Sequence, residues 1–162
     1  MNSLVRGAVA GVTGTAVMTA YQLAVAKLQG KPLATPVPHR WADAPPPAQV
    51  AKKATEAIGQ GGRFTREDVP LLTNAMHWLY GISWGAFYGV AAGAAQPDPV
   101  AGGLAFGTGV WGAAYAELVP LGIYKPPWKY PAKELAVDLS YHLVYGMVVA
   151  TAFAALTRDL NG

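Results

Sequence analysis

The stretch GISWGAFYGVAAG, residues 81–93, places a glycine at every fourth position among aromatic and aliphatic residues. These glycines are Gly81, Gly85, Gly89 and Gly93. In water, each glycine inside a helix costs roughly 1 kcal/mol relative to alanine, so such a series would argue against a helix. In a lipid bilayer the same spacing favours helix pairing, because small residues four apart let two helix backbones approach closely. The stretch therefore predicts a transmembrane helix that packs through its glycines.

Charged residues are scarce and unevenly distributed along the chain. They make up 13% of the 162 residues, about half the usual share of a soluble domain. Gaps of 20, 29, 18 and 19 residues without a formal charge follow Arg6, Asp68, Asp98 and Asp138. A helix needs about 20 mostly apolar residues to cross a bilayer. We predict an all-α integral membrane protein, one domain over residues 1–162, with four transmembrane helices at about 5–27, 74–95, 99–121 and 134–157.

Two other interpretations of the apolar segments remain open. A soluble helical bundle would have to bury nearly every face of every helix, which a chain of this length does poorly. The first segment also resembles a signal peptide, with small residues at Ala24 and Ala26. Since the chain retains Met1, we expect this segment to stay as a helix.

Basic residues predict the orientation in the membrane. The connections after the first and third helices carry ten of the twelve basic residues, and only Arg6 and Arg158 lie on the other side. The positive-inside rule then places those two connections in the cytoplasm and both termini outside.

The connections differ in length and composition. QPDP at residues 96–99 predicts a tight turn, and hence a central hairpin of the second and third helices. Residues 28–73 form a long, proline-rich cytoplasmic connection, in which AQVAKKATEAIGQ, residues 48–60, predicts a short amphipathic helix.

Small residues at the same spacing extend beyond the opening stretch. The first helix offers Gly7 and Gly11, and the third offers Gly109. We expect these glycines to pack helices together, and we expect Gly85→Leu to disrupt assembly.

Ionisable residues continue these helix faces toward the basic side of the membrane. We predict a polar cluster there, composed of His77, Glu117, Asp138 and His142. It could be structural, with a carboxylate paired to a histidine or to a loop lysine, or it could form a proton or small-solute pathway. His77 and His142 could also ligate a b-type haem, one from each helix. A carboxylate–histidine metal site is a further alternative, but no ExxH or HExxH pattern supports it, so no metal ligands and no cofactor are predicted.

The chain lacks the residues that several other functional classes require. The chain has no cysteine, no GxSxG motif and no phosphate-binding loop, so it offers no recognisable catalytic centre. Its net charge of +3 is spread over several loops rather than gathered in a patch, which argues against nucleic-acid binding.

The order of HWLYGISWGAFYG, a glycine-rich helix, VPLGIYKPPWKYPAKELAVDLSYHLVYG and a terminal TRDL resembles the YagU-like bacterial inner-membrane proteins. PVPHR after the first helix also fits this family. The resemblance implies a multi-pass protein of the bacterial inner membrane and supplies neither a catalytic residue nor a substrate.

These features favour a small structural or accessory membrane protein. We expect it to act by helix packing in the lipid bilayer, as a homo-oligomer or with other membrane protein subunits, rather than as an enzyme. A transporter or channel that uses the polar cluster is the alternative.

Overall fold

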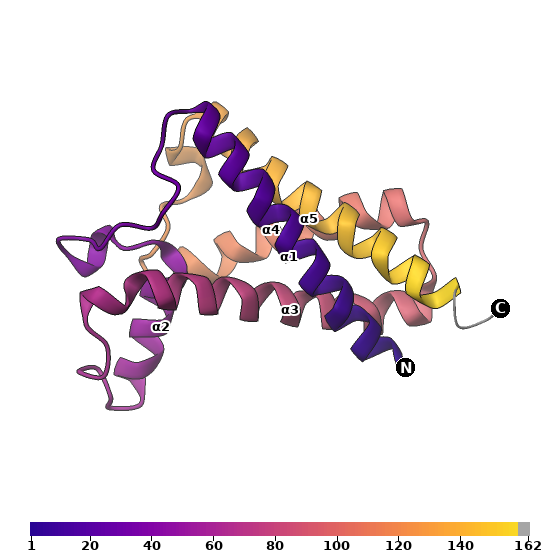
Figure 1. Ribbon diagram of the computed structural model, residues 1–162, viewed down its shortest axis with the longest axis horizontal. Helices are drawn as coiled ribbons and strands as arrows, with labels where there is room; N and C mark the ends of the chain where they lie inside the picture. Colours follow the sequence, from indigo (N-terminus) through magenta and orange to yellow (C-terminus); the bar gives the residue numbers. More distant parts are fainter. Residues whose placement is uncertain (159–162) are drawn as a thin grey trace.

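The computed structural model describes residues 1–158 as four long helices and one short one (Figure 1). The helices are α1 (Ser3–Leu28), α2 (Pro46–Ala57), α3 (Val69–Ala95), α4 (Pro99–Leu118) and α5 (Ala132–Arg158). Single 3-10 turns, η1 (Trp41–Asp43), η2 (Arg66–Asp68) and η3 (Pro127–Lys129), lie in the connections. No strand occurs within the described range, so the all-α prediction is confirmed.

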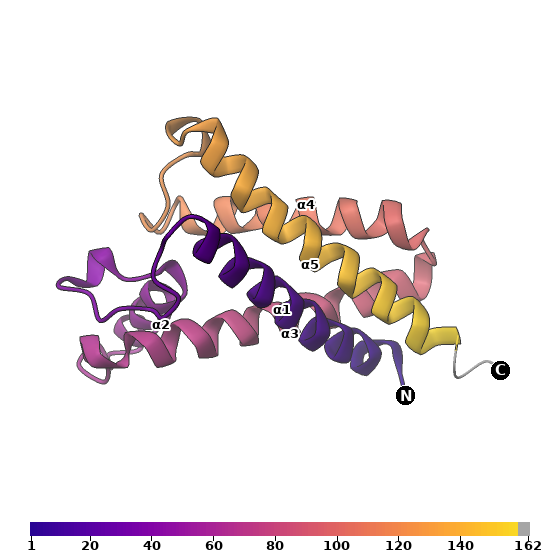
Figure 2. The same cartoon turned by 45° about the horizontal axis from the view of Figure 1, so that its top comes forward.

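The helices α1 and α5 form the centre of the molecule. They run antiparallel to one another, with α3 packed on the other side of α1 and α4 on the other side of α5 (Figures 1 and 2). The amino terminus and the end of α5 lie at the same end of the molecule.

The turn between α3 and α4 is tight, but the hairpin that it makes is not central. Gln96 adopts a left-handed conformation with φ of 45°, and the Asp98 carboxylate caps α4 by accepting the backbone N–H groups of Val100 and Ala101 at 3.0 and 2.9 Å. Beyond this turn the two backbones do not pack along each other. They contact instead through aromatic side chains, with ring centroids 4.7 Å apart for Tyr88 and Phe106. These rings keep α3 and α4 apart, and each helix packs on a central helix instead.

The contact between α1 and α3 is a regular antiparallel register of small residues. Each step of four residues along α3 is matched by a step of four back along α1. The facing pairs are His77 with Thr19, Gly81 with Thr15, Gly85 with Gly11, Gly89 with Gly7, and Gly93 with Ser3. A Cβ atom added to Gly11 would lie 2.8 Å from the Gly81 carbonyl oxygen, and one added to Gly7 would lie 2.7 Å from the Gly89 Cα. No side chain larger than hydrogen fits at these positions without moving a helix. We call Gly7, Gly11, Gly85 and Gly89 the closed glycine contact.

A second close approach joins α4 to α5. A Cβ atom on Gly146 would lie 2.6 Å from the Gly107 backbone nitrogen, and one on Gly103 would lie 2.9 Å from the Met147 Cα. Gly109, which we expected to pack against a helix, points elsewhere, since a Cβ atom there would meet nothing within 4 Å. The reason is the helical turn: Gly103 and Gly107 face α5, and Gly109 lies about 140° away from them on average around α4.

The long connection between α1 and α3 contains a small folded unit. Helix α2 packs on the first turns of α3 through a buried cluster that includes Ala48, Ala51, Val69 and Leu72. A reciprocal capping arrangement, in which the Asp68 carboxylate accepts the Thr65 backbone N–H at 2.8 Å, precedes α3. We call α2 and this cluster the α2 cap.

Two helices, α1 and α5, are long and apolar enough to cross a membrane. Their most apolar windows have mean hydropathies of 1.3 and 1.6, and only 28% of each window is buried inside the protein. Several large apolar residues of α1 are exposed, among them Leu4, Val9 and Leu23. These properties are compatible with a membrane protein.

Candidate functional site

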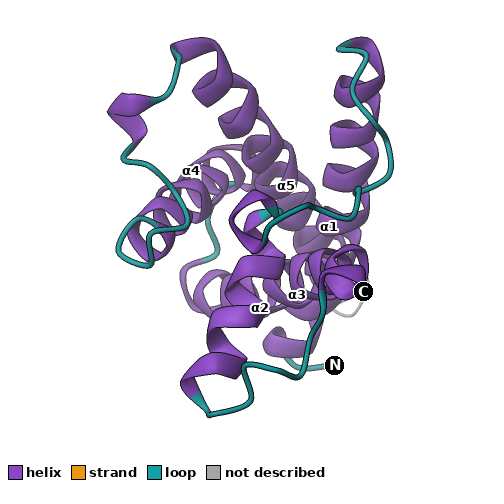
Figure 3. Ribbon diagram, turned by 90° about the vertical axis from the view of Figure 1, so that its left-hand side faces the viewer, coloured by secondary structure: helices purple, strands orange, loops and turns teal. Residues whose placement is uncertain are grey.

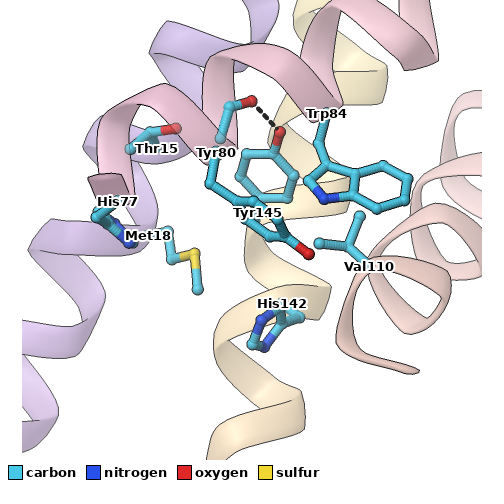
Figure 4. Close-up of a pocket in the computed structure, with 9 residues that line it drawn as sticks. Thr15, Met18, His77, Tyr80, Trp84, Val110, His142 and Tyr145 are labelled. Atoms are coloured by element: carbon cyan, nitrogen blue, oxygen red, sulfur yellow. Dashed lines mark hydrogen bonds between the residues drawn. The ribbon is translucent and has the colours of Figure 1, made fainter. Parts of the chain in front are cut away.

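A small cavity lies among α1, α3, α4 and α5, with a volume of about 60 Å³ (Figure 4). It is lined by Thr15, Met18, His77, Tyr80, Gly81, Trp84, Val110, His142 and Tyr145. The Tyr145 hydroxyl donates to the Gly81 carbonyl oxygen, which ties α5 to α3 beside the cavity. The space suffices for a few water molecules.

Both histidines that the sequence singled out line this cavity, from different helices. His77 on α3 lies with its Nε2 atom 3.2 Å from the Thr19 hydroxyl of α1. His142 on α5 donates its Nδ1–H to the Asp138 carbonyl oxygen at 2.9 Å, since a carbonyl oxygen only accepts. The Nε2 atom of a neutral His142 is thereby left as a hydrogen-bond acceptor.

Asp138 connects α5 to α4 near the cavity. Its Oδ2 atom accepts the Trp111 indole N–H at 2.9 Å and lies 3.4 Å from the Tyr115 hydroxyl. Its Oδ1 atom lies 4.0 Å from His142 Nδ1. Asp138 therefore joins two helices through aromatic donors, and its Oδ1 atom lies beyond hydrogen-bond distance of the His142 ring.

Glu117 lies apart from Asp138 and the histidines. Its carboxylate accepts the Tyr80 hydroxyl at 3.1 Å, which links the end of α4 to α3. Of the four residues expected to form one polar cluster, only Asp138 and His142 approach each other directly. Glu117 reaches the cavity only through Tyr80, a lining residue.

The cavity lined by His77 and His142 is too small for a haem. A cavity of about 60 Å³ is far below the ~300–1,000 Å³ typical of sites for organic ligands. Within residues 1–158 no three His, Asp or Glu side chains gather as a metal site would require.

Sequence reasoning missed the aromatic donors Tyr80, Trp111 and Tyr115. The spacing of Trp111 and Tyr115, four apart on α4, was a signal, because it places both donors on one face. Tyr80 lies three residues after His77, and although its place near the basic interface fits an aromatic belt, its spacing does not mark it as the donor to Glu117.

An aromatic group also closes the loop that follows α4. The ring of Tyr124 packs 5.1 Å from that of Tyr115 and 6.5 Å from that of Tyr130. Burial raises the pKa of the Tyr124 hydroxyl, and the nearby Asp138 carboxylate raises it further. This side chain therefore remains neutral at physiological pH.

The outward side of α4 carries a row of small, exposed residues. They are Ala101, Ala105, Gly109, Gly112 and Ala116. Spaced three or four apart, they share one face of the helix, and Cβ atoms on Gly109 and Gly112 would meet nothing within 4 Å. We call this row the α4 open face.

No protein family, curated protein or solved structure matches this chain in the comparisons made with it. The function proposed below therefore rests on the chain's own residues.

Proposed function

We propose that this chain is a small structural or accessory protein of the bacterial inner membrane, of the YagU-like kind that its sequence resembles. Four helices, α1, α3, α4 and α5, cross the bilayer, with both termini outside and the α2 cap in the cytoplasm. The protein assembles by packing its α4 open face on another transmembrane helix.

The observation that carries this proposal is the contrast between the glycines that pack and those that do not. Gly7 and Gly85 are needed for close approach within the chain, but Gly109 and Gly112 face open space. A row of small residues on the outside of a transmembrane helix is the surface through which such helices associate. The simplest partner is a second copy, because a twofold axis makes one such face complementary to itself.

Exposed apolar residues on the flanking helices support the membrane location. On α3, Leu79, Phe87 and Val90 are 59%, 60% and 55% exposed, which is costly in water over so large a surface. In a bilayer these side chains contact lipid tails.

The test is native mass spectrometry of the protein extracted from its own membrane in mild detergent. We expect two or more copies of the 16.9 kDa chain, or one copy with other membrane polypeptides. A bare monomer from the membrane would contradict assembly, and recovery of the chain in the soluble fraction would contradict the membrane location.

One observation favours a second function, proton or small-solute movement. His77, His142 and Tyr80 meet at one cavity between the helices. Proton flux in liposomes that His142→Ala abolishes, with Trp128→Phe as an active control at an exposed position outside the cavity and the α4 open face, would support this function. Flux no greater than that of empty liposomes would exclude it.

A further inference from the structure

A second, larger hollow lies where α1 ends and α5 begins. Its volume is about 460 Å³, and it is lined by Gln29, Lys31, Lys133, Glu134, Val137, Asp138 and Tyr141. Figure 3 shows the last turns of α1 and the first turns of α5 diverging, which opens this space. The helices meet again at Tyr21 and Tyr141, whose rings are 5.6 Å apart. We call the hollow the α1–α5 groove.

The groove carries both signs of charge, and these charges are not paired with one another. Within residues 1–158, Lys31, Lys133 and Glu134 make no ion pair and no side-chain hydrogen bond. Asp138 uses Oδ2 to accept from Trp111, and its Oδ1 atom has only the distant His142 at 4.0 Å. Two ammonium groups and two carboxylates thus line one space with capacity for a ligand that bears both charges.

The position of the groove indicates the kind of ligand. It lies at the ends of α1 and α5, the two helices long and apolar enough to cross a membrane, and therefore at the level of lipid headgroups. The amino-terminal end of α5 adds a partial positive charge on the side of Lys133. Val137 and Tyr141 continue the wall along α5 toward the apolar part of the bundle.

We propose that the α1–α5 groove binds the headgroup of a phospholipid with a primary ammonium, as in phosphatidylethanolamine. Lys31, Lys133 and the first turn of α5 bind the phosphate. Glu134 and the Oδ1 atom of Asp138 accept hydrogen bonds from the ammonium. This inference rests on the membrane location proposed above but not on assembly through α4.

The pairing of charges predicts a definite lipid preference. Phosphatidylcholine has the same net charge, but its quaternary ammonium has no N–H to donate, so Glu134 and Asp138 gain less from it. Phosphatidylglycerol has the phosphate alone and leaves both carboxylates unpaired. We expect phosphatidylethanolamine to bind at least fivefold more tightly than either.

The test is a lipid titration of the full chain in detergent, with lipid adducts counted by native mass spectrometry. Lys31→Gln with Lys133→Gln should weaken phosphatidylethanolamine binding about tenfold, and Lys53→Gln with Lys125→Gln, two exposed lysines outside the groove, should not change it. Glu134→Gln should reduce the preference over phosphatidylcholine, because it removes one of the two carboxylate charges that face the ammonium. All substituted side chains are at most part-buried, and an unchanged melting temperature shows that each variant is folded.

Three results would overturn the proposal. They are equal binding of the three lipids to the native chain, a full preference retained in Glu134→Gln, and displacement of the lipid by soluble glycerophosphoethanolamine at equal concentration, which would indicate a soluble ligand. The same spectra report the number of polypeptides. A monomer with selective lipid adducts refutes assembly alone, and an oligomer without them refutes this inference alone.

Discussion

The closed glycine contact and the α4 open face use the same residue type for opposite surroundings. At the closed contact, Gly85 lies against the backbone of α1, and a methyl group has no room. On α4, a Cβ atom added to Gly109 or Gly112 would meet nothing within 4 Å. A glycine in a helix is stabilising only where its lack of a side chain permits a close contact. The closed glycine contact provides such a close approach within one chain. The α4 open face provides it only if a helix of another chain covers it.

The largest expected effect is on fold stability, which should fall for a substitution in the closed glycine contact but not for one on the α4 open face. Gly85→Leu forces a branched side chain into the α1 backbone and should lower the free energy of unfolding by about 3 kcal/mol or more. In the dissociated monomer, Gly109→Leu projects into open space and should change this free energy by no more than about 0.5 kcal/mol. Unfolding in mixed detergent, followed by circular dichroism, measures both. The structure thus modifies the sequence expectation, since Gly85→Leu should damage the fold before any assembly. Equal stability of the two variants would contradict the distinction.

A smaller change probes the α4–α5 contact in the same way. Gly107→Ala places a methyl group 3.1 Å from the Leu143 Cα and against the His142 backbone, and it should cost about 1–2 kcal/mol. Its matched control, Gly112→Ala, gains helix propensity and meets nothing, so the monomer should be unchanged or slightly more stable. The same unfolding assay applies. A destabilising Gly112→Ala in the dissociated monomer would show that α4 is packed differently.

Loss of one hydrogen bond should have a still smaller effect. Trp111→Phe removes the indole donor to Asp138, which helps to orient α4 on α5, and it should cost about 1 kcal/mol. Trp128→Phe is the control, because Trp128 is 80% exposed and its indole N–H donates no hydrogen bond within residues 1–158. Equal melting temperatures for the two variants would mean that the Asp138 contact contributes nothing to helix orientation.

The smallest effect concerns a polar contact of the connection rather than the glycine contacts. The Arg40 guanidinium donates to both oxygens of Asp43 at 2.9 Å, and these bonds lower the pKa of that carboxyl. Because the pKa of Asp43 is lower in the folded state than in the unfolded state, the ionised carboxylate stabilises the fold at pH values above its unfolded pKa of about 3.9. This stabilisation is lost as the pH falls through the lowered folded-state pKa. We expect acidification from pH 5 to pH 3 to loosen residues 40–58 slightly, as measured by hydrogen exchange. Asp43→Asn should reduce this pH dependence of hydrogen exchange. An unaltered pH profile in that variant would contradict a role for the Arg40–Asp43 contact.

The sequence predicted where the helices begin and end better than it predicted which helices pack against one another. Charge-free gaps and the QPDP turn place the long helices within a few residues of their observed ends, because charges and prolines act locally. Gly81 to Gly93 marked a packing face, but a glycine row does not specify which helix it meets. Gly109 shows this limit, since its spacing of four from Ala105 resembled that of packed glycines, but a Cβ atom on it would face open space. Partners such as Trp111 for Asp138 depend on how α4 is rotated, which the tertiary contacts determine.

The central claim, that the α4 open face is an assembly surface in the membrane, is tested most directly by cysteine cross-linking. The native chain has no cysteine, so each single substitution reports on one position only. We predict that Ala105→Cys or Gly112→Cys forms a disulfide-linked dimer in native membranes on mild oxidation, because a symmetric α4 contact brings equivalent Cβ atoms to about 4 Å. Val90→Cys, exposed on α3, should remain monomeric. Cross-linking at Val90 as efficient as on α4, or a bare monomer with no cross-link at any α4 position, would contradict the claim.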